Sequence, residues 1–298
     1  KNCYWLENVD ITNLDSIVGP EQYSSFHDGV SYYYYRTYNW FENCRSLTSV
    51  TLPAMPKVQG LDSIFLNCSS LTDVTVGATP ACKAFSNFCQ GCSSLTSATF
   101  ADTSKAEKMN HMFQGCNSLE VQPEISTVSA KTVEALFNVC NLKSVNLELP
   151  KVTRAQYLCS NNPNLANVSI TFGQKITNAA YMFYRCKSLT DLSFADNWDM
   201  SDCDSLAHMF NGCEGLTSIT LDKWTLKASS DLGGVVASNK NLISFTLDFK
   251  GVSHNGNKSS MVADCPKLES FNMINPGNLS NFYALYYNTY FKTITLNI

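Results

Sequence analysis

The sequence predicts an α/β solenoid, a right-handed coil of about twelve rungs. Parallel strands are expected on one side and short helical or 3-10 segments on the other. A string of the form Met-Phe-x-x-Cys-x-x-Leu recurs, as at residues 112–119, 182–189 and 209–216. The copies follow one another at nearly constant steps, except for a longer first interval from Cys3 to Cys44. Such self-similarity is the sequence signature of a repeat architecture.

One position defines the register of the copies, and it is called the ladder slot below. It holds cysteine or asparagine, and its occupants are Cys3, Cys44, Cys68, Cys92, Cys116, Cys140, Asn162, Cys186, Cys213, Asn239, Cys265 and Asn288. Asparagine donates hydrogen bonds well and a thiol donates weakly. The alternation of these two residues predicts an inward side chain that bonds the backbone of the neighbouring turn.

A strand follows each ladder slot. A leucine stands three residues after the slot in most copies, and the third and fifth residues beyond it are apolar, as Val50 and Leu52 are around Thr51. Alternation with period two predicts a short strand with one buried face. The same pattern predicts a strand at Leu192 to Phe194. The copy after Leu119 departs from the pattern, because Pro123 cannot donate to a strand ladder.

A second apolar position precedes the ladder slot by three residues, and it is called the Phe slot. Phe113 occupies it in one copy, and Met109 and Met112 precede it at the spacing of an inward-facing helical turn. This spacing predicts the short helical or 3-10 segment on the side opposite the strands.

The chain of 298 residues is predicted to be a single domain over residues 1–298, because each rung of a repeat array contacts its neighbours alone. The net charge of −4 does not suggest a nucleic-acid partner. No run of about 18 apolar residues occurs, so no membrane insertion is expected from this segment. The sequence begins inside a rung without a signal peptide, which suggests a fragment.

Thirteen cysteines are present, and they are expected to be free, buried thiols, because all of them fall on inward positions. Stacked rungs lie about 4.8 Å apart, which exceeds the roughly 3.5–4.5 Å between Cβ atoms in a disulfide. Cys89 and Cys92 form a CxxC pair, but both already hold core positions. Asp196, Asp199 and their acidic neighbours favour a solvated loop over a calcium site. No metal and no cofactor is predicted.

The sequence contains no Ser/His/Asp arrangement, and the protein is not expected to be an enzyme. His111 and His208 hold the same position, five residues before the ladder slot, and a surface location is expected for it.

A tyrosine-rich insert over residues 12–40 separates the first two rungs. Aromatic residues are favoured anchors at interfaces. The candidate binding residues are Tyr32, Tyr33, Tyr35, Tyr38 and Trp40. The alternative is that these rings pack on the solenoid as a cap, and the sequence leaves both interpretations open.

The repeat resembles the BspA-like leucine-rich repeats of bacterial cell-surface proteins, whose unit has the form M-F-x-x-C-x-S-L-T-S-L-x-L. The Asp/Ser/Thr-rich link of that family is similar to residues 100–104 and 194–201. The resemblance implies an extracellular module at the bacterial cell surface, with its signal or anchor outside this fragment. It implies non-catalytic binding or adhesion to a protein or glycan on host or neighbouring cells. The alternative function is a structural stalk of a larger secreted protein. The oligomeric state is not predicted.

Overall fold

The computed structural model describes residues 3–7, 9, 22–27, 30–35, 39–250, 252–275, 288 and 292–297, and between 22 and 35 it describes the backbone alone. Contacts divide the chain into two compact units. The first comprises residues 1–142 and 148–151, and the second comprises residues 143–147 and 152–298. The assignment of one domain to residues 1–298 stays a prediction.

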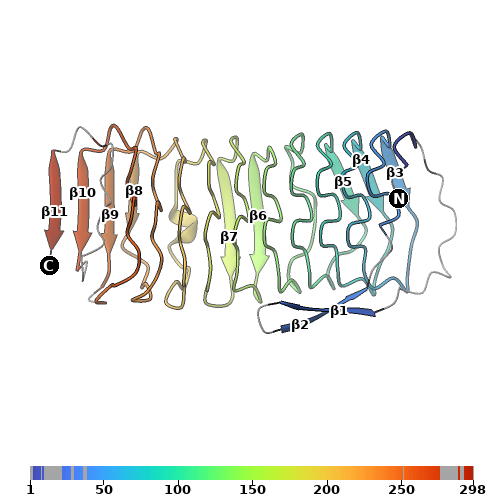
Figure 1. Ribbon diagram of the computed structural model, residues 1–298, viewed down its shortest axis with the longest axis horizontal. Coiled ribbons are helices and arrows are strands. Elements are labelled where there is room, and N and C mark those ends of the chain that lie inside the picture. The colour runs from blue at the N-terminus through green and yellow to red at the C-terminus, as the bar shows by residue number, and fades with distance from the viewer. Residues whose placement is uncertain are drawn as a thin grey trace. The chain divides into compact units, whose positions relative to one another are not determined.

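The first unit contains three parallel strands in chain order, β3 (Ser49–Leu52), β4 (Asp73–Val76) and β5 (Ser97–Phe100) (Figure 1). Val50 lies opposite Val74, and Val74 opposite Ala98, so equivalent residues of successive rungs face each other. These three residues are buried, and their strand neighbours face outward. The predicted apolar-polar alternation is therefore confirmed in these strands.

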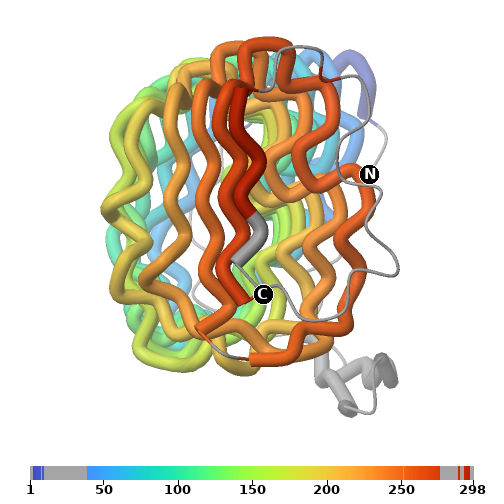
Figure 2. The backbone as a smooth tube through the Cα atoms, turned by 90° about the vertical axis from the view of Figure 1, so that its left-hand side faces the viewer, coloured from blue at the N-terminus to red at the C-terminus, as the bar shows by residue number. Residues whose placement is uncertain are grey.

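The second unit repeats this arrangement. β7 (Asn167–Phe172) pairs with β6 (Ser144–Leu149), of which residues 144–147 belong to this unit. β8 (Ser218–Leu221), β9 (Ser244–Asp248), β10 (Ser270–Ile274) and β11 (Thr293–Asn297) form a second parallel sheet in chain order. Successive turns of this unit follow the same path, with the strands on one side (Figure 2).

The side opposite the strands contains no α-helix among the described residues, so the predicted α/β class is not confirmed. Instead, backbone N–H groups of one rung donate to carbonyl groups of the next at 2.7–2.9 Å, from Leu61, Ser63, Phe65 and Asn67 to Ala84, Ser86, Phe88 and Gln90. An α-helix needs each N–H for the carbonyl four residues earlier in the same segment. Donors committed to the next rung are not available for that purpose.

Left-handed backbone also prevents helix formation. Non-glycine residues rarely adopt a positive φ, and a run of right-handed turns cannot continue through them. Two positions have positive φ in each rung from Cys44 to Cys265, five residues and one residue before the ladder slot. The first position is occupied by Asn39, Ser63, Asn87, His111, Ala135, Tyr157, Tyr181, His208, Gly234 and Ser260. The second is occupied by Asn43, Asn67, Gly91, Gly115, Val139, Asn161, Arg185, Gly212, Ser238 and Asp264.

The strand predicted at Leu192 to Phe194 is wrong, because the described chain forms a 3-10 helix, η1 (Ser193–Ala195), at this point. The Asp191 carboxylate accepts hydrogen bonds from the Ser193 N–H, at 3.1 Å, and from its hydroxyl, which turns the chain. Trp198 then fills the core, and its Nε1 donates to the Ile170 carbonyl at 3.0 Å.

The core is built from columns of equivalent residues, as predicted. In the Phe slot, Phe113 stacks on Phe137 with ring centroids 5.7 Å apart in the first unit. Phe183 stacks on Phe210 at 5.9 Å in the second. The predicted count of twelve rungs is not confirmed, since the described residues form about ten turns of the solenoid.

Candidate functional site

The tyrosine-rich insert forms an antiparallel hairpin of β1 (Gln22–His27) and β2 (Val30–Tyr35), which pair with each other from Gln22↔Tyr35 to His27↔Val30. Tyr32, Tyr33 and Tyr35 lie in β2, of which the backbone alone is described, and Tyr38 lies outside the described residues. Trp40 is half-buried, and its ring meets Phe41 edge-on at 6.5 Å. Whether the hairpin binds a partner or caps the array stays a prediction.

The ladder slot forms the predicted hydrogen bond to the neighbouring turn. Its side chain donates to the carbonyl of the Phe-slot residue in the preceding rung, and the heavy atoms are 2.6–3.3 Å apart. The bond recurs at Cys68, Cys92, Cys116, Cys140, Cys186, Cys213, Asn239, Cys265 and Asn288. The Asn162 amide also donates to the Cys159 carbonyl of its own rung at 2.9 Å. The slot therefore holds adjacent turns together from inside the core.

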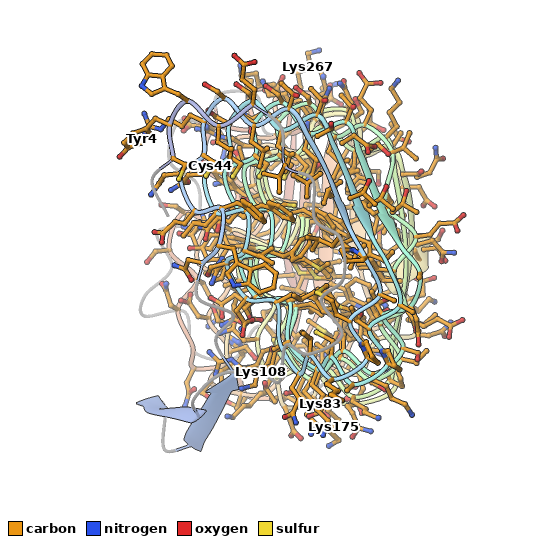
Figure 3. The ribbon with its side chains drawn as sticks, turned by 90° about the vertical axis from the view of Figure 1, so that its right-hand side faces the viewer. Tyr4, Cys44, Lys83, Lys108, Lys175 and Lys267 are labelled. Atoms are coloured by element: carbon orange, nitrogen blue, oxygen red, sulfur yellow. The ribbon has the colours of Figure 1, made fainter. Side chains whose placement is uncertain are left out.

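Twelve of the thirteen cysteines are buried, and none of the thirteen, all within the described residues, forms a disulfide. Cys3 is exposed, which corrects the expectation that every thiol is buried. Tyr4 next to it is also exposed (Figure 3). The Arg45 guanidinium lies 5.7 Å from the centroid of the Tyr4 ring. Burial raises the pKa of the Cys140 and Cys186 thiols to about 12. These two thiols are therefore protonated at neutral pH and poor nucleophiles.

The acidic residues of the Asp-rich link have local structural partners. The Asp199 carboxylate accepts from the Ser201 hydroxyl and N–H at 2.6 and 3.0 Å, and these bonds lower its pKa. Asp202 pairs with Lys175 at 3.3 Å, and Asp204 pairs with Lys227. Within the described residues, no group of three or more His, Cys, Asp or Glu side chains could hold a metal ion.

Sequence reasoning missed an aromatic column in the second unit, on the side opposite the strands. The rings of Tyr157, Tyr181 and His208 stack in consecutive rungs, with centroid distances of 4.8 Å for both pairs. Tyr184 meets Tyr181 edge-on at 5.6 Å, and the exposed Arg185 guanidinium lies 4.9 Å from the Tyr184 ring centroid. These five residues are called the aromatic column below.

The column members are partly exposed. Tyr157 is 37% exposed, and Tyr181 and His208 are half-buried. Asn211 donates to His208 Nδ1 at 3.0 Å, and burial lowers the pKa of that imidazole. The column ends at Gly234, where an added Cβ would lie 2.5 Å from the His208 ring. Aligning the position five residues before the ladder slot would have shown these rings in successive copies.

The aromatic column occupies strained backbone. Its three stacked residues have φ between 56° and 58°, a region in which a bulky side chain costs about 1–2 kcal/mol. Asn39 and Asn87 hold the equivalent position in the first unit, where asparagine tolerates this backbone. Since Ser63 and Ala135 also have positive φ at this position, the left-handed backbone belongs to the repeat, and the rings occupy it at a cost that asparagine would reduce.

A groove interrupts the strand side of the first unit. It encloses about 230 Å³ and is lined by Thr96–Phe100 and Val121–Glu124. The second segment contains Pro123 and forms no strand, as its sequence predicted. Val121 beside the groove is 74% exposed, and Pro123 is buried.

A comparison with known families agrees with the repeat pattern. The family described as BspA type leucine rich repeat region (6 copies) matches residues 1–120, 110–227 and 180–298. No curated protein matches. A solved leucine-rich repeat protein from Bacteroides ovatus is similar at 16% identity, over 97% of this chain and 94% of that chain, with a TM-score of 0.37. No helix in the described part of the chain is long and apolar enough to cross a membrane. Since the family matches span the whole sequence, the chain belongs to the BspA-type leucine-rich repeat family.

Proposed function

We propose that this protein is a non-catalytic binding module of a bacterial cell surface that recognises a host protein or glycan. The family supports this proposal, because BspA-type repeats are typically extracellular and often mediate surface binding. A repeat scaffold alone does not specify a ligand, so the proposal depends on a surface feature of this chain.

The aromatic column is the observation that carries the proposal. Tyrosine and arginine are enriched among residues that dominate binding energy. Both faces of the Tyr181 ring are covered by neighbouring rings, so a partner meets the edges of the stacked rings. Ring edges carry partial positive charge and attract electronegative atoms. Oxygen atoms of a glycan or of a protein main chain would meet this requirement.

Two carboxylates with lowered pKa values have structural roles in turns. Asp102 and Asp191 each accept hydrogen bonds from a serine two residues later, and these bonds lower the pKa of both carboxyl groups. Both side chains face solvent, and neither lies in the groove. These two carboxylates thus stabilise turns of the backbone, as Asp side chains commonly do.

The experiment is a binding screen of the purified chain against host matrix proteins and glycans, followed by slot-compatible substitutions. Tyr157→Asn, Tyr181→Asn and His208→Asn together remove the rings and keep a residue that tolerates the left-handed backbone. We expect at least a tenfold loss of affinity for the ligand that the screen identifies.

The matched control is His111→Asn, which removes a ring from the same position between Asn87 and Ala135 in the first unit. Its affinity should remain within twofold of the parent. Unchanged affinity in the folded triple variant would contradict the role of the column. A screen without any ligand would favour the alternative function, a structural stalk.

A further inference from the structure

The outer edge of β5 lacks the strand that the repeat should place beside it. The carbonyl groups of Thr72, just before β4, and of Val76, at its end, face the next rung, where they accept from the N–H groups of Ser97 and Ala101. Equivalent residues of β4 and β5 lie opposite each other. The carbonyl groups of Thr96, Ala98 and Phe100 therefore face the following rung, and their expected donors are the N–H groups of residues 121, 123 and 125.

Pro123 removes the central donor, because its nitrogen carries no hydrogen. β5 consequently pairs with β4 alone among the described strands. After Pro123, the chain bonds to a side chain that follows β5 and not to the strand itself, since the Ser126 N–H donates to Thr103 Oγ1 at 2.7 Å. One proline thus accounts for both the missing strand and the groove.

Sheet edges of this kind are usually protected. Natural proteins place charged residues, proline or a bulge on an edge strand so that no other chain pairs with it. β5 has the sequence Ser-Ala-Thr-Phe, which contains none of these features. The groove of about 230 Å³ beside it is lined by Thr96–Phe100, so this strand borders open space.

We propose that the outer edge of β5 binds an extended strand of a partner protein, which pairs with Thr96–Phe100 in place of the missing rung. This inference goes beyond the proposed function, because it adds a second binding site and names the class of partner for that site. Main-chain hydrogen bonds would supply the affinity, and alternate side chains the specificity.

The surroundings of the groove define the preferred strand. Its outward residues continue the column of Thr75 and Thr99, where serine or threonine pairs well across strands. Its inward residues face the half-buried Phe100 and should be apolar. Glu124 is exposed, lines the groove and favours a basic residue at one end of the strand. A glycan does not offer N–H groups at the two-residue spacing of the edge carbonyls.

The first test uses a fluorescent peptide, acetyl-Leu-Thr-Ser-Ile-Thr-Leu-Lys-amide, which copies the pattern of β8 with a basic end. In a parallel arrangement, the N–H groups of its serine and second threonine face β5. We expect saturable binding by fluorescence anisotropy. N-methylation of these two amides should weaken it at least tenfold, and N-methylation of the isoleucine and leucine amides less than twofold.

The second test changes the protein. Pro123→Thr restores the N–H group, so residues 121–125 can pair with β5 and cover its edge. We expect at least tenfold weaker peptide binding and slower amide hydrogen exchange in residues 120–126. The control is Pro163→Thr, an exposed proline in a turn of the second unit, which should leave peptide binding unchanged.

Three results would overturn the inference. They are the absence of saturable peptide binding, equal effects of both N-methylated peptides, and a Pro123→Thr variant that shows protected amides but full peptide affinity. A glycan from the screen that loses affinity in Pro123→Thr would assign the groove to a different partner class. The proposed function would survive each of these results, because it depends on the aromatic column.

Discussion

Replacing Cys116 by alanine tests the ladder slot. Cys116 is fully buried, and its Sγ donates to the Cys89 carbonyl at 3.2 Å. That carbonyl also accepts from the Cys92 N–H at 3.1 Å, so it keeps one partner in the variant. The lost thiol bond then costs about 0.5–1.5 kcal/mol. The cavity left by one heavy atom adds about 0.5–1.5 kcal/mol, for a total of about 1–3 kcal/mol.

Asparagine and leucine at position 116 separate the hydrogen bond from simple packing. In the equivalent position, Asn239 Nδ2 donates to the Phe210 and Val236 carbonyls at 3.0 and 2.7 Å. Its Oδ1 has no hydrogen-bond partner, which offsets part of that gain. We expect Cys116→Asn to lose about 0–2 kcal/mol, because the amide keeps the donor. Cys116→Leu should lose about 2–4 kcal/mol, because leucine cannot donate and overfills the slot.

The assay is equilibrium urea unfolding of the parent and the three variants, followed by circular dichroism. The slope of the unfolding free energy against urea concentration must agree among the four proteins, so that the midpoints report stability and not a changed unfolded state. Equal destabilisation by asparagine and leucine would refute the reasoning, since the slot would then be an apolar cavity without a directional role.

Three further predictions concern other parts of the chain. In the native protein, a thiol reagent should modify Cys3 rapidly and the other cysteines slowly, whereas denatured, unreduced protein should be alkylated at all thirteen positions; disulfides found by mass spectrometry would contradict this. His254 is fully buried, and burial and nearby Lys258 lower its pKa to about 4. Its folded pKa lies below the ordinary value of 6.5, so the stability that depends on the neutral imidazole should be complete above pH 6.5. As the pH falls from 6.5 to 4, the free energy of unfolding should fall by about 1–3 kcal/mol, the lower value allowing for solvent screening. If the stability of His254→Gln keeps the same pH dependence, His254 is not its source. Exchange of residues 20–38 for a link of ordinary repeat length should lower affinity if the hairpin contacts the ligand, and loss of the circular dichroism signal would identify the hairpin as a cap.

The strands and core columns were predictable because apolar alternation and repeat spacing report burial directly. Phe113 and Cys116 recur at constant spacing, and both are buried where the register placed them. The helical segments were not predictable from the same rule. The spacing of Met109, Met112 and Phe113 fits any compact inward turn, and hydrogen bonds to the next rung decide which turn forms.

A usable signal for the left-handed turns was nevertheless present. Asn67, Gly91 and Gly115 precede successive ladder slots, and asparagine and glycine are the residues that adopt a positive φ at low cost. The same alignment places Tyr157, Tyr181 and His208 in one column. The groove beside β5 was harder to foresee, because Pro123 predicts a broken ladder but not the path of the chain that follows it.

In the turns that lead to the ladder slots, the backbone hydrogen bonds between rungs run in one direction, and this has an electrical consequence. Within each unit, the N–H group belongs to the earlier rung and the carbonyl to the later one, as for Phe65 with Phe88 and Cys159 with Met182. Peptide dipoles aligned in this way add, as they do along a helix. The late end of such a stack is then partially positive and rich in donors, and the early end is partially negative and rich in acceptors. A second copy could extend such a stack late end to early end, which is the geometry of an open filament and not of a two-fold dimer.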